Sequence, residues 1–392
     1  MGILQEFKES IQDYVLGVIN NDRQGKGVKF VRILLSVSSV IFGWLVQVRL
    51  KLYKSGIFRT KSLGCRIVSI GNITVGGTGK TPAVELFARE LQKEGRKVAV
   101  ISRGYRSSSR FRIKRFVKKL LLLIPKDKQI KVVSDGKKIY LNSYLGGDEP
   151  YMLAKNLPGV VVAVDKDRIK AGQYVIEKYG VDTIVLDDGF QYLSLNPRYD
   201  VVLIDSTNPF GNGHLLPRGI LRESLDNLSR ANLFMLTKVQ PGQDLSLIKA
   251  TIRQYNFKAD FIECRHRAVS FVSIENGMEK PLSFIKNKRV GVVSAIADPA
   301  GFEKRVEELG GQVVGTCRFQ DHHRFSVKEL REIVEDFSSK DITVLISTEK
   351  DAVRFPKLSQ NKSIQMYYLR VEMEILSGEE DFKNCISNLS FR

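Results

Sequence analysis

A glycine-rich segment at residues 71–82, GNITVGGTGKTP, carries the clearest chemical signal in the sequence. It follows an apolar run and opens a helical pattern, which is the context that a phosphate-binding P-loop requires. The glycines let backbone N–H groups turn inward around phosphate oxygens, Lys80 reaches the β- and γ-phosphates, and Thr81 offers a hydroxyl to Mg²⁺. Thr74 stands where the usual pattern has a glycine, and an ordinary glycine-rich turn is the alternative. We predict a nucleotide-binding loop formed by Thr74, Val75, Gly76, Gly77, Thr78, Gly79, Lys80 and Thr81.

Two adjacent carboxylates follow a second apolar run and could complete such a site. The segment DTIVLDDGFQ places Asp187 and Asp188 at the end of a predicted strand, which Gly189 ends abruptly. A P-loop nucleotide site needs a carboxylate at the end of a neighbouring strand to hold Mg²⁺ or its water. We therefore predict that Thr81, Asp187 and Asp188 hold Mg²⁺, with a polar strand-end turn as the alternative.

Five further polar motifs stand at apparent strand ends. Each alone could be a solvated loop, but together they place carboxylates, two adjacent histidines and several arginines in loops, where α/β enzymes keep catalytic groups. The motifs are SRGYR (102–106), GGDEP (146–150), LLPRGILRE (215–223), DHHRF (321–325) and TEKDAVR (348–354).

The elements that must position these motifs alternate short β-branched runs with helical patterns, the rhythm of a parallel α/β sheet. We predict an α/β fold with a P-loop NTPase-type parallel sheet and a second, smaller α/β domain. The predicted domains are an N-terminal helical segment (1–62), a P-loop domain (63–238) and a C-terminal α/β domain (239–392). Strands are predicted at residues 66–71, 97–102, 160–165, 182–188, 200–205, 232–238, 289–297, 311–319, 341–348 and 364–373.

A basic segment at about residues 107–143 interrupts this rhythm and contains the apolar run LLLLI. Its first part could form a basic amphipathic helix, which membranes attract. A solvated loop followed by a hairpin around Asp135 and Gly136 is the alternative. We interpret the segment as an insertion and leave both conformations open.

The apolar stretch from Ile33 to Val46 is shorter than the roughly 20 residues that a membrane-spanning helix needs. Lysines and arginines flank it on both sides, and Trp44 could sit at the level of lipid head groups. This pattern is typical of a helix that lies in an anionic membrane surface. We predict membrane association for the N-terminal helix, with a buried core helix as the alternative.

The overall charge is strongly basic, with 62 Lys and Arg against 43 Asp and Glu and a formal net charge of +19. Such a balance favours an anionic partner, and nucleic acid, anionic lipids and phosphorylated substrates all qualify. The four cysteines are far apart without a C-x-x-C pair, which argues against a disulfide scaffold and a zinc site. No secretory signal is apparent, so we expect the catalytic part in the cytoplasm.

Eight motifs in a fixed order give the sequence a specific resemblance to the tetraacyldisaccharide 4'-kinases. They are the seven segments above and an ADP-containing strand exit at residues 297–299, and the resemblance covers nearly the whole chain from about Val28. It implies a P-loop fold with a second α/β domain joined by a β-ribbon, at the cytoplasmic face of the bacterial inner membrane. It also implies transfer of the γ-phosphoryl group of ATP to the 4'-hydroxyl of tetraacyldisaccharide 1-phosphate, giving lipid IVA, with ATP and Mg²⁺ required.

The resemblance assigns catalysis to Asp148 of GDEP and His322 of DHHRF, together with Lys80 and Asp188 of the nucleotide site. A sugar hydroxyl is a poor nucleophile, so a carboxylate must accept its proton as the phosphoryl group transfers. His322 could orient Asp148 or share its proton. His323 is the alternative to His322, because adjacent side chains usually point apart.

Further motif residues are expected at the substrate. Those of LPRGILRE could contact phosphate or orient catalytic groups, with surface ion pairing as the alternative. The predicted substrate residues are Arg103, Tyr105, Glu149, Gln191, Arg218, Arg222, Glu223, Asp321 and His323.

Two other classes compete with a lipid kinase. A nucleic-acid-binding ATPase would explain the charge, but the basic residues gather beside apolar runs, and no RRM, KH or zinc-finger signature is present. A regulatory GTPase would need an N-K-x-D motif to recognise the guanine base, and TEKD resembles that motif only loosely. We therefore expect the lipid substrate and the inner-membrane surface as partners, with no nucleic acid and no obligate protein partner.

Overall fold

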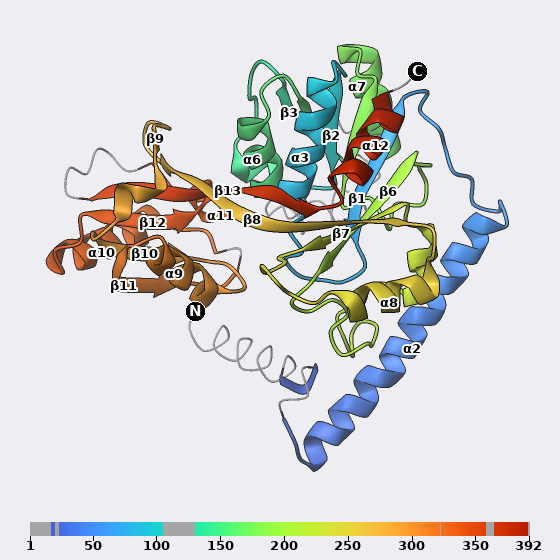
Figure 1. Cartoon of the computed structure of the whole chain (residues 1–392), viewed down its shortest axis with the longest axis horizontal. Helices are drawn as coiled ribbons and strands as arrows, with labels where there is room; N and C mark the ends of the chain where they lie inside the picture. Colours follow the sequence, from blue (N-terminus) through green and yellow to red (C-terminus); the bar gives the residue numbers. More distant parts are fainter. Residues whose placement is uncertain (1–16, 20–22, 105–129, 322, 358–363, 391–392) are drawn as a thin grey trace, which may run out of the picture. The chain divides into compact units, whose positions relative to one another are not determined.

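The structure is a computed structural model that describes residues 17–19, 23–104, 130–321, 323–357 and 364–390 (Figure 1). The chain forms two compact units, which we call unit 1 (residues 1–80, 186–265 and 375–392) and unit 2 (residues 81–185 and 266–374). Three strands run from one unit into the other along the chain: β5 (Thr183–Asp187), β8 (Asp260–Ser273) and β13 (Gln365–Ser377).

Unit 1 is built on parallel strands in the order β8-β7-β6-β1. Strands β1 and β7 are buried along almost their whole length, and such continuous apolar runs are typical of parallel sheets covered on both faces. One apolar cluster includes Phe190, Ile204 and Phe234. The elements of unit 1 are α2 (Lys26–Lys54), β1 (Arg66–Asn72), β6 (Tyr199–Asp205), the 3-10 helix η2 (Leu225–Arg230), β7 (Leu233–Thr237), α8 (Ser246–Tyr255) and α12 (Glu379–Ser390).

Unit 2 contains two groups of strands. In one, β4 pairs in parallel with β2 and antiparallel with β3; in the other, the parallel order is β11-β10-β12-β13. Phe337 packs directly over Gly291 and Gly315, where any side chain would collide with its ring. The elements of unit 2 are α3 (Lys80–Lys93, whose first residue belongs to unit 1), β2 (Val98–Ser102), β3 (Lys131–Asp135), α5 (Ser143–Gly146), α6 (Asp148–Asn156), β4 (Val161–Val164), α7 (Arg168–Tyr179), β9 (Glu279–Lys280), the 3-10 helix η3 (Leu282–Ile285), β10 (Arg289–Ser294), α9 (Pro299–Glu308), β11 (Gln312–Arg318), α10 (Val327–Ser339), β12 (Val344–Thr348) and α11 (Glu349–Ala352).

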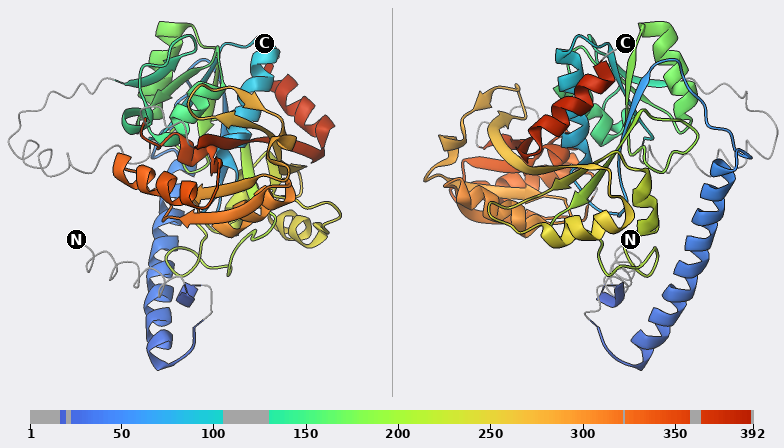
Figure 2. Two further views of the ribbon diagram at one scale, coloured as in Figure 1. Left: turned by 90° about the vertical axis from the view of Figure 1, so that its left-hand side faces the viewer. Right: turned by 45° about the vertical axis from the view of Figure 1, so that its right-hand side comes forward.

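Helix α2 is one unbroken helix of 29 residues, drawn in blue (Figure 2). It is longer than the predicted apolar stretch because the basic flanks, rich in good helix formers, continue the helix. Among the described residues it is the one helix long and apolar enough to cross a membrane by length and composition.

The predicted α/β architecture with mostly parallel strands is confirmed, and each predicted strand is present. Strand β8 escaped prediction because the polar run ECRHR interrupts its apolar alternation. The turn around Asp135 and Gly136 is confirmed: the backbone N–H of Tyr140 donates to the carbonyl of Val133 at 2.8 Å. The earlier part of the insertion, residues 105–129, lies outside the described residues. The domain boundaries at residues 62 and 238 stay predictions.

A buried ionic network ties α3 to α11 within unit 2. The guanidinium of Arg370 contacts Glu85, and its Nη1 lies 2.8 Å from Oε1 of Glu349. The amide of Asn156 donates to Glu349 at 2.7 Å. Burial raises the pKa of Glu349, and Arg370 and Asn156 oppose that shift. Arg370 thus compensates two carboxylates that are largely shielded from water, with 9% of the Glu85 side chain and 13% of the Glu349 side chain exposed.

Replacing Arg370 with methionine should lower the free energy of unfolding by about 3–5 kcal/mol, because it leaves two buried carboxylates uncompensated. The loss should shrink toward pH 5, since a carboxyl group with a raised pKa in the folded state stabilises the fold while protonated and loses that contribution as pH rises. Urea unfolding at both pH values measures this. Arg305→Met, which breaks an exposed pair with Glu308, is the control. A loss below about 1 kcal/mol at pH 7, the range of exposed pairs, would contradict the assignment.

Candidate active site

The predicted phosphate loop lies between β1 and α3, as a P-loop requires. The chain turns sharply at Gly76 (φ +117°) and Gly79 (φ +81°), a backbone region that favours glycine. Nothing lies within 4 Å of the position that a Cβ would take at Gly76 or Gly77. The loop therefore leaves open space beside its backbone, which is what the approach of a phosphate group needs.

Asn72, the last residue of β1, fixes the conformation of this loop through side-chain hydrogen bonds. It is fully buried, and its Nδ2 donates to the carbonyl of Thr74 at 2.6 Å and to Oγ1 of Thr78 at 3.1 Å. Its Oδ1 accepts from Nζ of Lys80 at 3.3 Å and from Nη1 of Arg222 at 3.0 Å. One amide thus fixes the loop backbone and the two cations beside it.

Asp188 joins the same cluster. It follows β5 with φ +54°, and its carboxylate receives two hydrogen bonds from Arg222, at 2.6 and 3.1 Å. Nζ of Lys80 lies 3.8 Å from Oδ1 of Asp188. Asp187 is buried, with 5% of its surface exposed. The structure thereby brings together Lys80, Asp188 and Arg222 from three separate predicted motifs.

The other predicted residues of unit 1 contact different groups. Gln191 donates to the carbonyl of Asn72 at 3.1 Å. Arg218 is buried, which lowers its pKa, and it donates to the carbonyl of Ile19. Glu223 is also buried and pairs with Arg230 at 2.8 Å. Of the predicted residues in LPRGILRE, Arg222 contacts Asn72 and Asp188 beside the phosphate loop.

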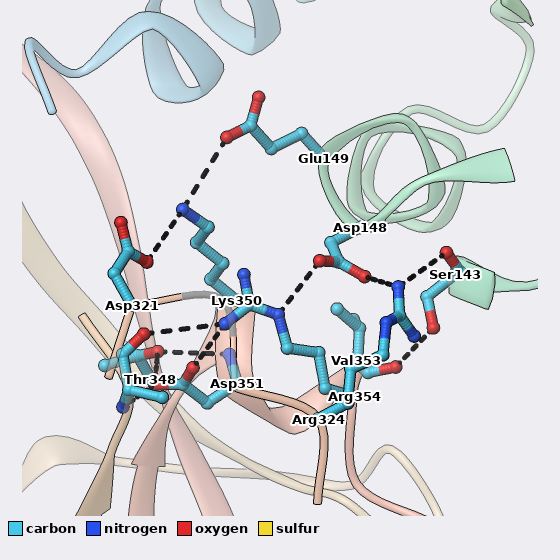
Figure 3. A network of polar contacts seen from close by, with 11 residues as sticks. Ser143, Asp148, Glu149, Asp321, Arg324, Thr348, Lys350, Asp351, Val353 and Arg354 are labelled. Carbon is cyan, nitrogen blue, oxygen red and sulfur yellow. Dashed lines mark hydrogen bonds and ion pairs between the residues drawn. The ribbon is translucent and has the colours of Figure 1, made fainter. Parts of the chain in front are cut away.

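A second polar cluster lies within unit 2 and contains Asp148 (Figure 3). Asp148 is the first residue of α6, where a helix N-terminus favours a negative charge. Nε of Arg354 donates to Oδ2 at 2.9 Å, and Nη2 of Arg324 donates to Oδ1 at 2.9 Å. The sequence stretches GDEP, DHHRF and TEKDAVR therefore meet around one carboxylate.

Three more predicted residues stand in or near this cluster. Nζ of Lys350 lies 3.8 Å from Glu149 and 3.5 Å from Asp321 (Figure 3). The ring of His323 stacks on Phe319 with centroids 4.6 Å apart, and its Nε2 lies 3.3 Å from Glu329. Arg103 is exposed after β2. Tyr105 and His322 lie outside the described residues.

Comparison with known proteins agrees with the motif order. The profile of the tetraacyldisaccharide-1-P 4'-kinase family, LpxK, matches residues 31–390. The chain belongs to this family. The tetraacyldisaccharide 4'-kinase of Halothermothrix orenii is 33% identical over 98% of this chain and 100% of the relative. That of Anaeromyxobacter dehalogenans is 37% identical over 84% of this chain and 83% of the relative.

A solved structure gives the same result. The LpxK of Aquifex aeolicus, described as an apo form in complex with ATP, superposes with a TM-score of 0.71 at 25% identity and covers 92% of this chain and 100% of that one. The LpxK resemblance inferred from the eight motifs is therefore confirmed, together with the P-loop fold.

Three residues of these two polar clusters escaped the sequence analysis: Asn72, Arg324 and Arg354. Asn72 could have been found as a polar residue ending an otherwise apolar strand just before the loop. The two arginines stand in motifs that we quoted, but their contacts with Asp148 join residues 176 and 206 positions apart. Spacing in the sequence carries no signal for such pairs.

The donor set fits Mg²⁺, which prefers oxygen ligands and is usually held by one or two carboxylates together with substrate phosphates and water. Of the predicted ligands Thr81, Asp187 and Asp188, Asp188 places a carboxylate oxygen 3.8 Å from Nζ of Lys80. In the part of the chain that the structure describes, no three His, Cys, Asp or Glu side chains converge on a common metal site.

Asn72→Ala should weaken ATP binding about tenfold to a hundredfold, because the loop carbonyl, Lys80 and Arg222 each lose a buried partner worth ~1–3 kcal/mol. Displacement of a fluorescent ATP analogue measures the affinity, and a thermal melt confirms folding. Asn276→Ala in the exposed β8–β9 turn is the control. Unchanged ATP affinity in a folded Asn72→Ala protein would show that this amide does not organise the loop.

Proposed function

We propose that this chain is an ATP-dependent kinase that transfers the γ-phosphoryl group to the 4'-hydroxyl of tetraacyldisaccharide 1-phosphate, giving lipid IVA in lipid A synthesis. The observation that carries the proposal is the cluster at an open P-loop in which Lys80 and Arg222 both donate to Asn72 and both pair with Asp188. Membership of the LpxK family supplies the acceptor class. ATP binding by the relative from Aquifex aeolicus supports ATP as the donor.

The phosphate loop would bind the nucleotide through its inward-turned backbone N–H groups and through Lys80. Thr81, Asp187 and Asp188 would hold Mg²⁺, which neutralises phosphate charge when bound. Arg222 pairs with Asp188 and donates a hydrogen bond to Asn72, which also accepts one from Lys80. It would therefore keep the carboxylate oriented and add positive charge beside the transferred group.

Asp148 would accept the proton of the sugar hydroxyl as that oxygen bonds to phosphorus. Its place at the start of α6 fixes the carboxylate on a rigid element. The resemblance makes His322 its partner. His323 stands against Phe319 and Glu329, which supports a packing role for it and leaves His322 as the proposed catalytic histidine. Arg103, Tyr105, Glu149, Gln191, Arg218, Glu223 and Asp321 are retained as proposed substrate or supporting residues.

Helix α2 would hold the protein on the membrane that contains the substrate. One side of it is an exposed apolar stripe, formed by Phe30, Ile33, Leu34, Val37, Val40, Ile41, Trp44 and Leu45. The opposite side packs on unit 1: the hydroxyl of Ser39 donates to the carbonyl of Leu215 at 2.8 Å, and that of Tyr53 lies 2.7 Å from Oγ of Ser194. A spanning helix would have to give up these contacts. We therefore infer that α2 lies in the cytoplasmic surface of the inner membrane.

Transfer of label from γ-labelled ATP to tetraacyldisaccharide 1-phosphate in detergent micelles tests the activity directly. The unchanged protein should label the lipid, and Lys80→Ala should reduce the rate at least about a hundredfold, because charge stabilisation at the transferred phosphoryl group is lost. Lys93→Ala, on the exposed end of α3, is the matched control. ATP hydrolysis without labelled lipid would reject the lipid kinase and point to another acceptor.

Ile41→Glu with Val37→Glu should weaken binding to vesicles of phosphatidylcholine and phosphatidylglycerol about a hundredfold or more, since each apolar side chain contributes about 1.5–3 kcal/mol when buried. Flotation of vesicles with bound protein measures this. Leu247→Glu on α8 changes a leucine outside α2 that is even more exposed than Ile41 and Val37, and it is the control. Equal losses for both variants would contradict a specific role of α2.

A further inference from the structure

Both oxygens of the Asp148 carboxylate are engaged by arginines (Figure 3). Oδ2 accepts from Arg354 and Oδ1 from Arg324, each at 2.9 Å. A carboxylate that acts as a base must present an oxygen lone pair to the incoming hydroxyl. Each oxygen keeps a second lone pair for that hydroxyl, but the guanidinium bound to it stabilises the charged carboxylate and so opposes transfer of a proton to it. Release of one of these two ion pairs therefore makes Asp148 a better proton acceptor.

Arg354 is the fixed partner. Its side chain is fully buried, and its Nη1 donates to Oδ1 of Asp351 at 3.0 Å. Asp351 is itself fully buried and is held by the backbone N–H of Ala295 at 2.9 Å and the hydroxyl of Thr348 at 2.7 Å. Moving Arg354 would leave Asp351 buried without its cation, which is strongly unfavourable.

Arg324 is the exchangeable partner. Its side chain is 40% exposed, and its other contacts are weak: the carbonyl of Ser143 at 3.4 Å and the ring of Tyr144, 5.4 Å from the guanidinium carbon. Exposed ion pairs contribute little to stability. A guanidinium binds phosphate as readily as carboxylate. A phosphate group can therefore compete with Asp148 for Arg324 but cannot reach Arg354.

We propose, on the basis of the kinase function above, that Arg354 is a positioning residue that fixes Asp148 through Oδ2, and that Arg324 releases Oδ1 by exchanging onto a phosphate group of the bound lipid substrate. Oδ1 then accepts the hydroxyl proton while the hydroxyl oxygen bonds to phosphorus and the bond from phosphorus to the ADP oxygen breaks. Without the lipid substrate, Arg324 keeps the base occupied and so limits transfer of phosphate from ATP to water.

The test compares Arg354→Lys and Arg354→Met with Arg324→Gln in the lipid-labelling assay. Both Arg354 variants should lower kcat, by about a hundredfold for methionine, because a small misplacement of a catalytic group costs that much. Affinity for ATP should stay unchanged. Lysine keeps the charge but cannot contact Asp148 and Asp351 as a planar fork, so its loss should be intermediate. Arg318→Met, which breaks an exposed bidentate pair with Glu303, is the control.

Arg324→Gln should behave differently from both Arg354 variants. Its KM for the lipid substrate should rise at least about tenfold, because the phosphate group loses its guanidinium partner, whereas its kcat should fall less than that of Arg354→Met. Its ATP hydrolysis in the absence of lipid should rise severalfold, because the base is no longer occupied. A kcat that falls as far as in Arg354→Met would overturn the exchange.

A double-variant comparison separates positioning from folding and from the function itself. If Arg354 acts through Asp148, Arg354→Lys should add no further loss in an Asp148→Asn background. Full additivity, or an active Arg354→Met enzyme beside an inactive Asp148→Asn, would reject the positioning role alone. An active Asp148→Asn enzyme would reject Asp148 as the base. Absence of lipid labelling by the unchanged protein would reject the kinase function and the inference with it.

Discussion

The side-chain amide of Asn72 is the interaction on which the nucleotide site depends. It is buried at the end of β1, where two donors face the loop and one acceptor faces Lys80 and Arg222. Unlike a carboxylate, an amide can serve both sides without adding charge. The loop is therefore already shaped before a ligand arrives, which lowers the entropic cost of binding phosphate.

In both polar clusters, around Asp188 and around Asp148, arginine side chains neutralise the carboxylate. Asp188 is paired with Arg222 and Asp148 with Arg324 and Arg354, so each carboxylate has a guanidinium partner within its own unit. Such pairs keep negative charge from repelling an anionic substrate and orient the carboxylate oxygens. Under the proposed mechanism, substrate phosphates would compete with these carboxylates for arginine, which would link substrate binding to release of the proposed catalytic carboxylate.

The sequence predicted the parallel strands and the phosphate loop because both are written in local patterns, apolar runs and glycine spacing. It also placed Lys80, Asp188 and Arg222 in site motifs, although their contacts appear only once the chain folds. Strand β8 was missed because its polar middle hides the alternation, and Arg324 and Arg354 because the contacts with Asp148 bridge some two hundred residues. Long-range ion pairs follow from topology and packing, which no single segment encodes.

The side of α2 that packs on unit 1 determines how a water-soluble form of this enzyme could be engineered. Deleting the helix would uncover Leu215, which precedes Arg222 in the same loop. It would also remove the contact between Tyr53 and Ser194, three residues after Gln191. Gly43 lies so close to Leu215 that a side chain there would collide with it. A water-soluble variant should therefore carry polar side chains in place of the exposed apolar stripe of α2 and keep the side that packs on unit 1 unchanged. If α2 is the proposed membrane anchor, it is also part of the scaffold, and the two roles are divided between opposite sides of one helix.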